Sequence, residues 1–274
     1  MDKIVFAGDS FTWGEGLELF IENDKWISQR KKHSEWDELS VIQDDESVEF
    51  RENHRFPRLA AKELGMVEIV HKNNGGSLSS YWKFMDDRKN IPDVKAFVIQ
   101  LSQANRDAIH LTWECKCDVC TKFDWANIDD LFSAIKNNSR KPLRDYIVSV
   151  MGCDSVGNEF YRRFFLWLSW QKRFISNLFI EYCKMLEERA PVYFIDTWDV
   201  EEKNWINTTP YVRERMIPLV DRKGNYHTSW GNWEKTFDVK WIAEMFPETK
   251  NFHPTPELHR YLAKSVVDFL TDKI

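Results

Sequence analysis

Short apolar runs recur along the chain, and a polar turn follows each of the first four at once. Each run is continuous rather than alternating with polar residues, which is typical of strands covered on both faces in a parallel sheet. The polar turns after the runs are therefore where a ligand site is expected. The five runs are Ile4–Ala7, Val67–Val70, Ala96–Leu101, Val192–Ile195 and Ile217–Val220.

Helical patterns lie between and after these runs. Apolar residues recur at helical spacing over Arg55–Leu64 and from about Glu159 to Arg189, and Thr255–Leu270 carries one apolar stripe with Pro256 in its first turn. Alternation of strand and helix predicts a doubly wound, three-layer α/β domain with a mostly parallel sheet of about five strands. Ligands bind such domains at the carboxyl ends of the strands.

Two stretches exceed this minimal alternation. Residues 16–54 are acidic and carry tryptophans, and residues 108–158 contain clustered cysteines. We expect a single domain over residues 1–274, with both stretches as insertions over the strand ends. The acidic run 44–46 is interpreted as a solvated loop.

Charge and hydropathy exclude several classes of protein. The chain has 38 Lys and Arg against 44 Asp and Glu, a net charge of −6, whereas binding to phosphates requires a clustered basic surface. No run approaches the roughly 20 apolar residues of a spanning helix, and the N-terminal segment 1–7 is too charged for a secretory signal. We expect a cytoplasmic protein with neither nucleic acid nor membrane as a partner.

Two residues far apart in the sequence are candidates for catalysis. Ser10 follows the first run in the segment 8–14, Gly-Asp-Ser-Phe-Thr-Trp-Gly, and His253 precedes a proline just before the last helix. Both are expected on one rim of the sheet, where His253 could take a proton from the Ser10 hydroxyl. The alternatives are a helix-capping serine and a loop histidine. His259, farther along, is interpreted as a residue of the helix surface.

These motifs give the chain a resemblance to the SGNH/GDSL-type serine hydrolases. Gly-Asp-Ser at 8–10 resembles that family's nucleophile block, and His253-Pro254 resembles its terminal catalytic block. The resemblance implies a flavodoxin-like α/β/α fold and ester or acetyl-ester hydrolysis without a cofactor. It also implies an oxyanion hole formed by the N–H groups of Ser10 and Gly76 and by the Asn105 amide. Asp9, Trp13 and Gly75 are the candidate substrate-binding residues.

The terminal block departs from the family pattern because Asn251 stands where a catalytic acid is expected. Its amide oxygen can orient the imidazole but cannot supply the charge that stabilises an imidazolium. A Ser-His dyad, or a carboxylate from Glu248, Asp221 or Asp196, could serve instead. The chain could equally have kept the fold and lost the chemistry.

A cysteine cluster lies in the second predicted insertion. Cys115, Cys117 and Cys120 have a spacing that can supply three thiolate ligands to a tetrahedral zinc ion, with Cys153, Cys183 or His110 as the fourth ligand. Such a zinc would be structural, and reduced loop cysteines are the alternative.

Two hypotheses follow for the whole chain. The first is a serine esterase or deacetylase that acts on a small or carbohydrate-linked acyl ester. The second is a catalytically silent module of the same fold that binds a ligand or partner through its insertions.

Overall fold

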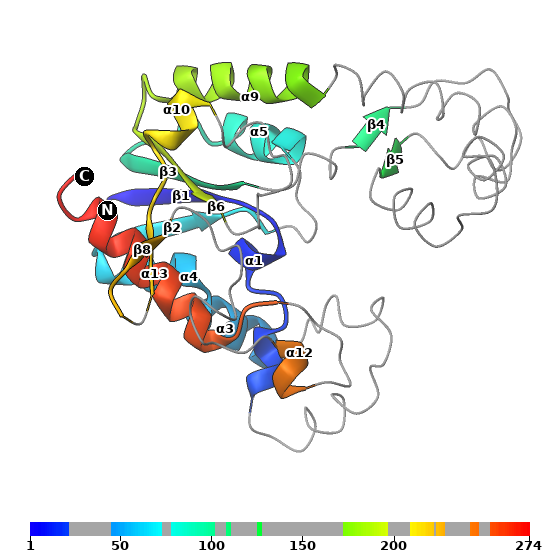
Figure 1. Ribbon diagram of the computed structural model, residues 1–274, viewed down its shortest axis with the longest axis vertical. Coiled ribbons are helices and arrows are strands. Elements are labelled where there is room, and N and C mark those ends of the chain that lie inside the picture. Colours follow the sequence, from blue (N-terminus) through cyan, green and yellow to red (C-terminus); the bar gives the residue numbers. More distant parts are fainter. Residues whose placement is uncertain are drawn as a thin grey trace, which may run out of the picture.

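A computed structural model shows an α/β fold built on a parallel four-stranded sheet (Figure 1). The strand order is β2-β1-β3-β6, so β1 and β3 are the two central strands. This arrangement confirms the predicted α/β class and the mostly parallel sheet. The four strands are β1 (Lys3–Ala7), β2 (Val67–Val70), β3 (Val94–Leu101) and β6 (Val192–Asp196). The structure describes residues 1–21, 45–72, 78–101, 108–110, 125–127, 172–196, 209–221, 223–227, 242–246 and 253–274.

The fifth predicted strand only begins beside the sheet. Phe194 of β6 pairs in parallel with Met216, and the Ile217 N–H donates to the Phe194 carbonyl at 2.8 Å. The chain then leaves the sheet, because β7 (Leu219–Val220) pairs antiparallel with β8 (Tyr226–His227). This run therefore contributes a single bridge to the parallel sheet.

Helices cover both faces of the sheet and form the outer layers of the predicted three (Figure 1). Ile4 and Phe6 of β1 point into the core beneath α4 (Phe56–Glu63) and α13 (Pro256–Leu270). Val5 and Ala7 point the other way, into the core beneath α5 (Leu78–Asp86) and α9 (Lys172–Leu186). This alternation explains the continuous apolar run, since both faces of the strand are buried.

Two predicted helices are confirmed at 55–64 and 255–270, and α9 lies inside the third predicted stretch. The acidic run is a correction to the sequence prediction, because Asp45 and Glu46 form the first turn of α3 (Asp45–His54). Carboxylates are favoured there by the unpaired N–H groups of a helix start. The helix was hidden because the residues it buries, Ser47 and Arg51, are polar and leave no apolar stripe to detect.

The remaining elements are short, and within the described residues no helix is long and apolar enough to cross a membrane. They are α1 (Ser10–Trp13), the 3-10 helix η1 (Leu17–Phe20), α10 (Pro210–Arg213), α12 (Ile242–Met245) and the antiparallel pair β4 (Ala108–His110) and β5 (Trp125–Asn127).

Candidate active site

The carboxyl end of β1 leads directly into the helical turn that holds Ser10. Gly8 directly follows the strand, Asp9 caps the helix, and Ser10 is the first residue of α1. A Cβ atom at Gly8 would overlap the Thr12 hydroxyl and lie 2.7 Å from Gln100 Oε1, so only glycine allows this close approach. The tight turn therefore places Ser10 at the rim of the sheet, as the sequence predicts.

A buried hydrogen-bond network ties this turn to the neighbouring strand β3. Asp9 Oδ1 accepts from the Phe11 N–H at 3.0 Å and from Gln100 Nε2 at 2.6 Å. The Thr12 hydroxyl donates to Gln100 Oε1 at 2.5 Å. Gln100 thus uses both ends of its amide to fix α1, although it lies inside an apolar run and carried no signal of a role there. These contacts position the turn, and substrate binding by Asp9 stays a prediction.

His253 lies opposite Ser10, just before α13. Its Nε2 is 2.8 Å from Ser10 Oγ, although 243 positions separate the two residues in the sequence. The ring packs against Phe11 with centroids 5.4 Å apart, and the His253 carbonyl accepts from the Ile242 N–H at 3.2 Å. Both members of the pair are buried, Ser10 at 2% exposed and His253 at 6%. The pair has the contact that transfer of the serine proton to histidine requires.

Glu15 is a site residue that sequence reasoning missed. Its Oε2 lies 3.5 Å from His253 Nε2, and its side chain is only 6% exposed. The chain reaches this position because Gly14 ends α1 with φ +86°, and the Glu15 N–H donates to the Ser10 carbonyl at 3.0 Å. The signal available in the sequence was a charged residue between two glycines, Gly14 and Gly16, in a largely apolar segment.

Arg51 contacts both Trp13 and a second buried carboxylate, that of Glu18. The Arg51 guanidinium lies 4.2 Å from the centre of the Trp13 ring and 3.3 Å from Glu18. Burial raises the pKa of Glu18, and the charge of Arg51 opposes this rise. Trp13 is itself only 8% exposed, so it packs on Arg51, and its predicted contact with substrate stays a prediction.

His259 corrects the sequence interpretation, which placed it on the helix surface. It is 0% exposed, because α13 packs against α4, α3 and β7 and buries more than one stripe. Its Nδ1 accepts from the Phe56 N–H at 3.1 Å, and its ring stacks on the Phe56 ring. Burial, followed by the neighbouring charges of His253, Arg55 and His54, lowers the pKa of His259 to about 3. His259 is therefore a neutral, structural histidine, and it lies six positions after His253, the candidate base.

His71 supports the other side of the Gly8 turn. Its Nδ1 donates to the Gly8 carbonyl at 2.8 Å, and its ring contacts Tyr81 and Phe84. Burial lowers the pKa of His71, which favours the neutral imidazole.

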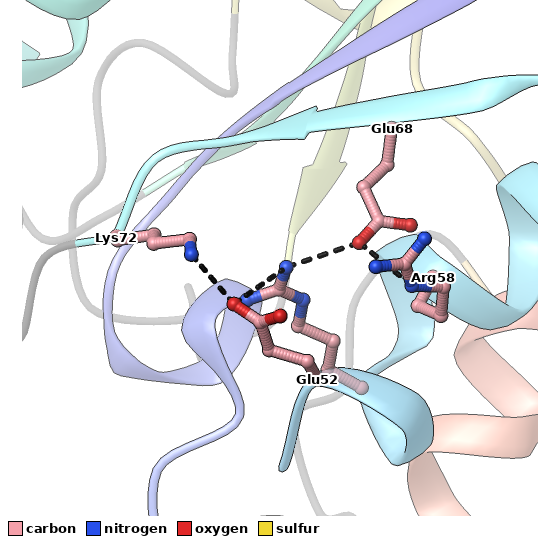
Figure 2. Close-up of polar contacts among 5 residues, drawn as sticks. Glu52, Arg58, Glu68 and Lys72 are labelled. Carbon is pink, nitrogen blue, oxygen red and sulfur yellow. Dashed lines mark hydrogen bonds and ion pairs between the residues drawn. The ribbon is translucent and has the colours of Figure 1, made fainter. Parts of the chain in front are cut away.

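A charged cluster joins α3, α4 and β2 (Figure 2). Arg55 lies 3.0 Å from Glu68 and 3.8 Å from Glu52, and Arg58 and Lys72 complete the group at its exposed edge. Arg55 and Glu68 have side chains only 3% and 4% exposed. The cluster fixes the start of α4, and with it Phe56 beneath His259.

Several predicted site residues lie outside the described part of the chain. They are Gly75, Gly76, Asn105, Asn251, Cys115, Cys117, Cys120 and Cys153, together with Glu248, one of the three carboxylates that could replace the catalytic acid. The carboxylate of Asp221 accepts from the Lys223 and Asn225 N–H groups and so holds its own turn. The third carboxylate, that of Asp196, is buried at the end of β6.

The part of the chain that the structure describes contains no group of three or more His, Cys, Asp or Glu residues arranged to hold a metal ion. Cys183 is a free cysteine on α9, and it is buried in the hydrophobic core beneath this helix. The zinc site predicted for the cysteine cluster stays a prediction, and less than about a tenth of an equivalent of zinc by elemental analysis of the purified protein would contradict it.

No family model matches the chain, and no curated protein matches it. Two solved structures align with it. One comes from a carbohydrate esterase whose active site displays divergent catalytic and non-catalytic binding functions, with a TM-score of 0.42, 15% identity and 99% of this chain covered. The chain covers 65% of that protein's length. The other, provisionally named as an arylesterase from Agrobacterium tumefaciens str. C58, has a TM-score of 0.41, 11% identity and full coverage of both chains. Similarity this low supports no inference about activity.

Proposed function

We propose that the protein is a serine ester hydrolase of the SGNH type, with Ser10 as nucleophile and His253 as base. The observation that carries the proposal is the 2.8 Å contact between Ser10 Oγ and His253 Nε2 at the carboxyl end of β1. A serine is a weak nucleophile unless an adjacent base takes its proton, and this contact lies within hydrogen-bond reach. A purely capping role for Ser10 is disfavoured, since Asp9 is the residue that caps α1.

The reaction runs in two halves. Ser10 Oγ attacks the ester carbonyl carbon while its proton passes to His253 Nε2, and the carbonyl π electrons move onto the oxygen. When the tetrahedral intermediate collapses, the leaving alkoxide takes the proton from Nε2 and departs as an alcohol. Water then attacks the acyl-serine, again giving a proton to Nε2, and the proton returns to Ser10 Oγ as the carboxylic acid leaves.

The developing oxyanion needs hydrogen-bond donors. The Ser10 N–H is at the start of α1, where the first N–H groups have no intrahelical acceptor, and it makes no hydrogen bond within the described part of the chain. We assign the other two donors to the Gly76 N–H and the Asn105 amide, and Asn251 to the orientation of His253. Each oxyanion donor is worth about 3 kcal/mol of transition-state stabilisation.

The substrate that we propose is a small or carbohydrate-linked acyl ester. The mechanism consumes only water and uses no cofactor, because nucleophile, base and oxyanion donors all belong to the chain.

Reaction with a fluorophosphonate tests the nucleophile without knowledge of the substrate. Intact-mass spectrometry should show one adduct on the wild type and none on Ser10→Ala, because the reagent captures an activated serine. His253→Ala should also lose the adduct, since the base is then missing. A folded wild type that gains no adduct would contradict the proposal and favour the silent binding module.

A further inference from the structure

We propose that Glu15 is the charge partner of protonated His253 and thereby supplies the negative charge that Asn251 cannot. This inference rests on the proposed function and deepens it by adding a residue to the same site. It is drawn from the placement of a buried carboxylate beside the nitrogen that receives the serine proton.

The two contacts of His253 Nε2 differ in kind. Ser10 Oγ lies at 2.8 Å, a full hydrogen bond, whereas Glu15 Oε2 lies at 3.5 Å, too long for a good hydrogen bond but within the range of an ion pair. Glu15 therefore leaves the hydrogen bond between serine and histidine in place. Its effect on His253 is electrostatic, and it is strong because both side chains are at most 7% exposed.

Glu15 is fixed to the nucleophile by the backbone. The Ser10 carbonyl accepts from the N–H groups of both Gly14 and Glu15, at 2.8 and 3.0 Å. Gly14 and Gly16 on either side have φ values of +86° and +84°, a conformation that glycine adopts without strain. The backbone of Glu15 is therefore tied to that of Ser10, and the buried side chain reaches His253 from this fixed point.

Three other ionisable groups of the described segments around this site are paired or neutral. Glu18, on the same segment as Glu15, pairs with Arg51. His259, which faces His253 from α13, has a pKa that burial lowers to about 3 and so carries no charge at neutral pH. Arg55 faces His259 and is held by Glu68 and Glu52. Glu15 is the carboxylate that lies 3.5 Å from His253 Nε2, the nitrogen that is protonated in the reaction.

This placement assigns Glu15 a role that differs from that of an orienting acid. An orienting acid contacts the far ring nitrogen and selects the tautomer of the imidazole. Glu15 lies on the side of Nε2, so it stabilises the imidazolium formed when the proton leaves Ser10 Oγ. The proton itself stays on Nε2 until the leaving alkoxide takes it.

The test is Glu15→Gln, which keeps the shape of the side chain and removes its charge. NMR titration of the His253 ring should show its pKa lowered by about one pH unit, since an opposite charge at this distance has an effect of that size. The acid limb of kcat/KM for p-nitrophenyl acetate should move to lower pH by the same amount, and the plateau should fall by up to about tenfold. Glu15→Asp keeps the charge but places it farther from His253, because its side chain is one methylene shorter. This variant should give an intermediate His253 pKa and an intermediate rate.

Glu181→Gln is the matched control, because it removes one carboxylate from an exposed ion pair on α9, which packs on the opposite face of the sheet from α13. In this variant the pKa of His253 and the value of kcat/KM should equal those of the wild type. An unchanged His253 pKa in folded Glu15→Gln would overturn the inference, and so would a lowered pKa with an unchanged rate.

Failure of the proposed function is distinguishable from failure of this inference. If the wild type neither hydrolyses the ester nor gains a fluorophosphonate adduct, the proposed hydrolase is wrong. The His253 titration still supports or overturns the partnership with Glu15 in that case, because it requires no turnover.

Discussion

Two buried histidines on one segment of the chain have opposite surroundings. His253 Nε2 meets a hydroxyl and a carboxylate, whereas His259 Nδ1 accepts a backbone N–H and its ring stacks on Phe56. Their exposures are similar, at 6% and 0%, so burial does not separate them. What separates them is the partner, since only a ring beside an anionic group can gain a proton at moderate cost. A buried histidine should therefore be judged by its contacts.

Removal of His253 should have the largest effect, and removal of His259 should not share it. His253→Ala is expected to lower ester hydrolysis at least about a thousandfold, because Ser10 then has no base. His259→Asn should retain hydrolysis, since asparagine can still accept from the Phe56 N–H. Rates of both variants with p-nitrophenyl acetate, compared after circular dichroism has shown both to be folded, decide the matter. Equal losses in the two folded variants would contradict the purely structural role of His259.

The support of the Ser10 turn gives the next largest effect. Gln100→Leu removes a donor from buried Asp9 and an acceptor from Thr12, so stability is expected to fall by about 2 to 3 kcal/mol in urea unfolding. Labelling of Ser10 by the fluorophosphonate should also slow, because the turn that holds Ser10 opposite His253 is loosened. Thr12→Ser keeps the hydroxyl and should cost less than about 1 kcal/mol. A Gln100→Leu protein of wild-type stability would show that the network does not hold the turn.

His259 should reveal itself through the pH dependence of stability. Its folded pKa of about 3 lies below the ordinary value of 6.5, so the unfolded chain binds this proton first as the pH falls. Between pH 7 and pH 5 the titration of His259 should therefore lower the free energy of unfolding by about 2 kcal/mol. His259→Asn lacks this titration, and its stability should fall by that much less over the same interval. Parallel curves for the wild type and the variant would mean that folding does not shift the pKa of His259.

The sequence predicted the sheet well because four apolar runs are strands, three of them largely buried on both faces and the fourth, β2, at the edge of the sheet. It also predicted that Ser10 and His253 lie on one rim of the sheet, since they follow and precede elements whose ends meet there; their catalytic roles stay a prediction. Glu15 could not be found in this way, because its approach to His253 depends on the backbone turn at Gly14. Gln100 was hidden for a related reason, as an amide inside an apolar run has no period that distinguishes a network from a core position.

A change at the exposed edge of the charged cluster should have the smallest effect, because neither histidine contacts Lys72 or Glu52 in the described part of the chain. Burial would raise the pKa of Glu52, but the hydrogen bond from Lys72 and the charges of Arg55, Lys72 and Arg58 together lower it. A carboxyl group with a lowered pKa stabilises the fold at pH values above its ordinary pKa of 4.5. This contribution is lost as the pH falls through the folded pKa. Lys72→Met should remove part of it at pH 7, by less than about 1 kcal/mol, since the Lys72 side chain is 59% exposed. Urea unfolding at low and high salt measures this loss, which should shrink at high salt because the pair is screened.

A loss of several kcal/mol would instead mean that the exposed edge of the cluster, and not the buried pair of Arg55 and Glu68, holds the start of α4 beneath His259.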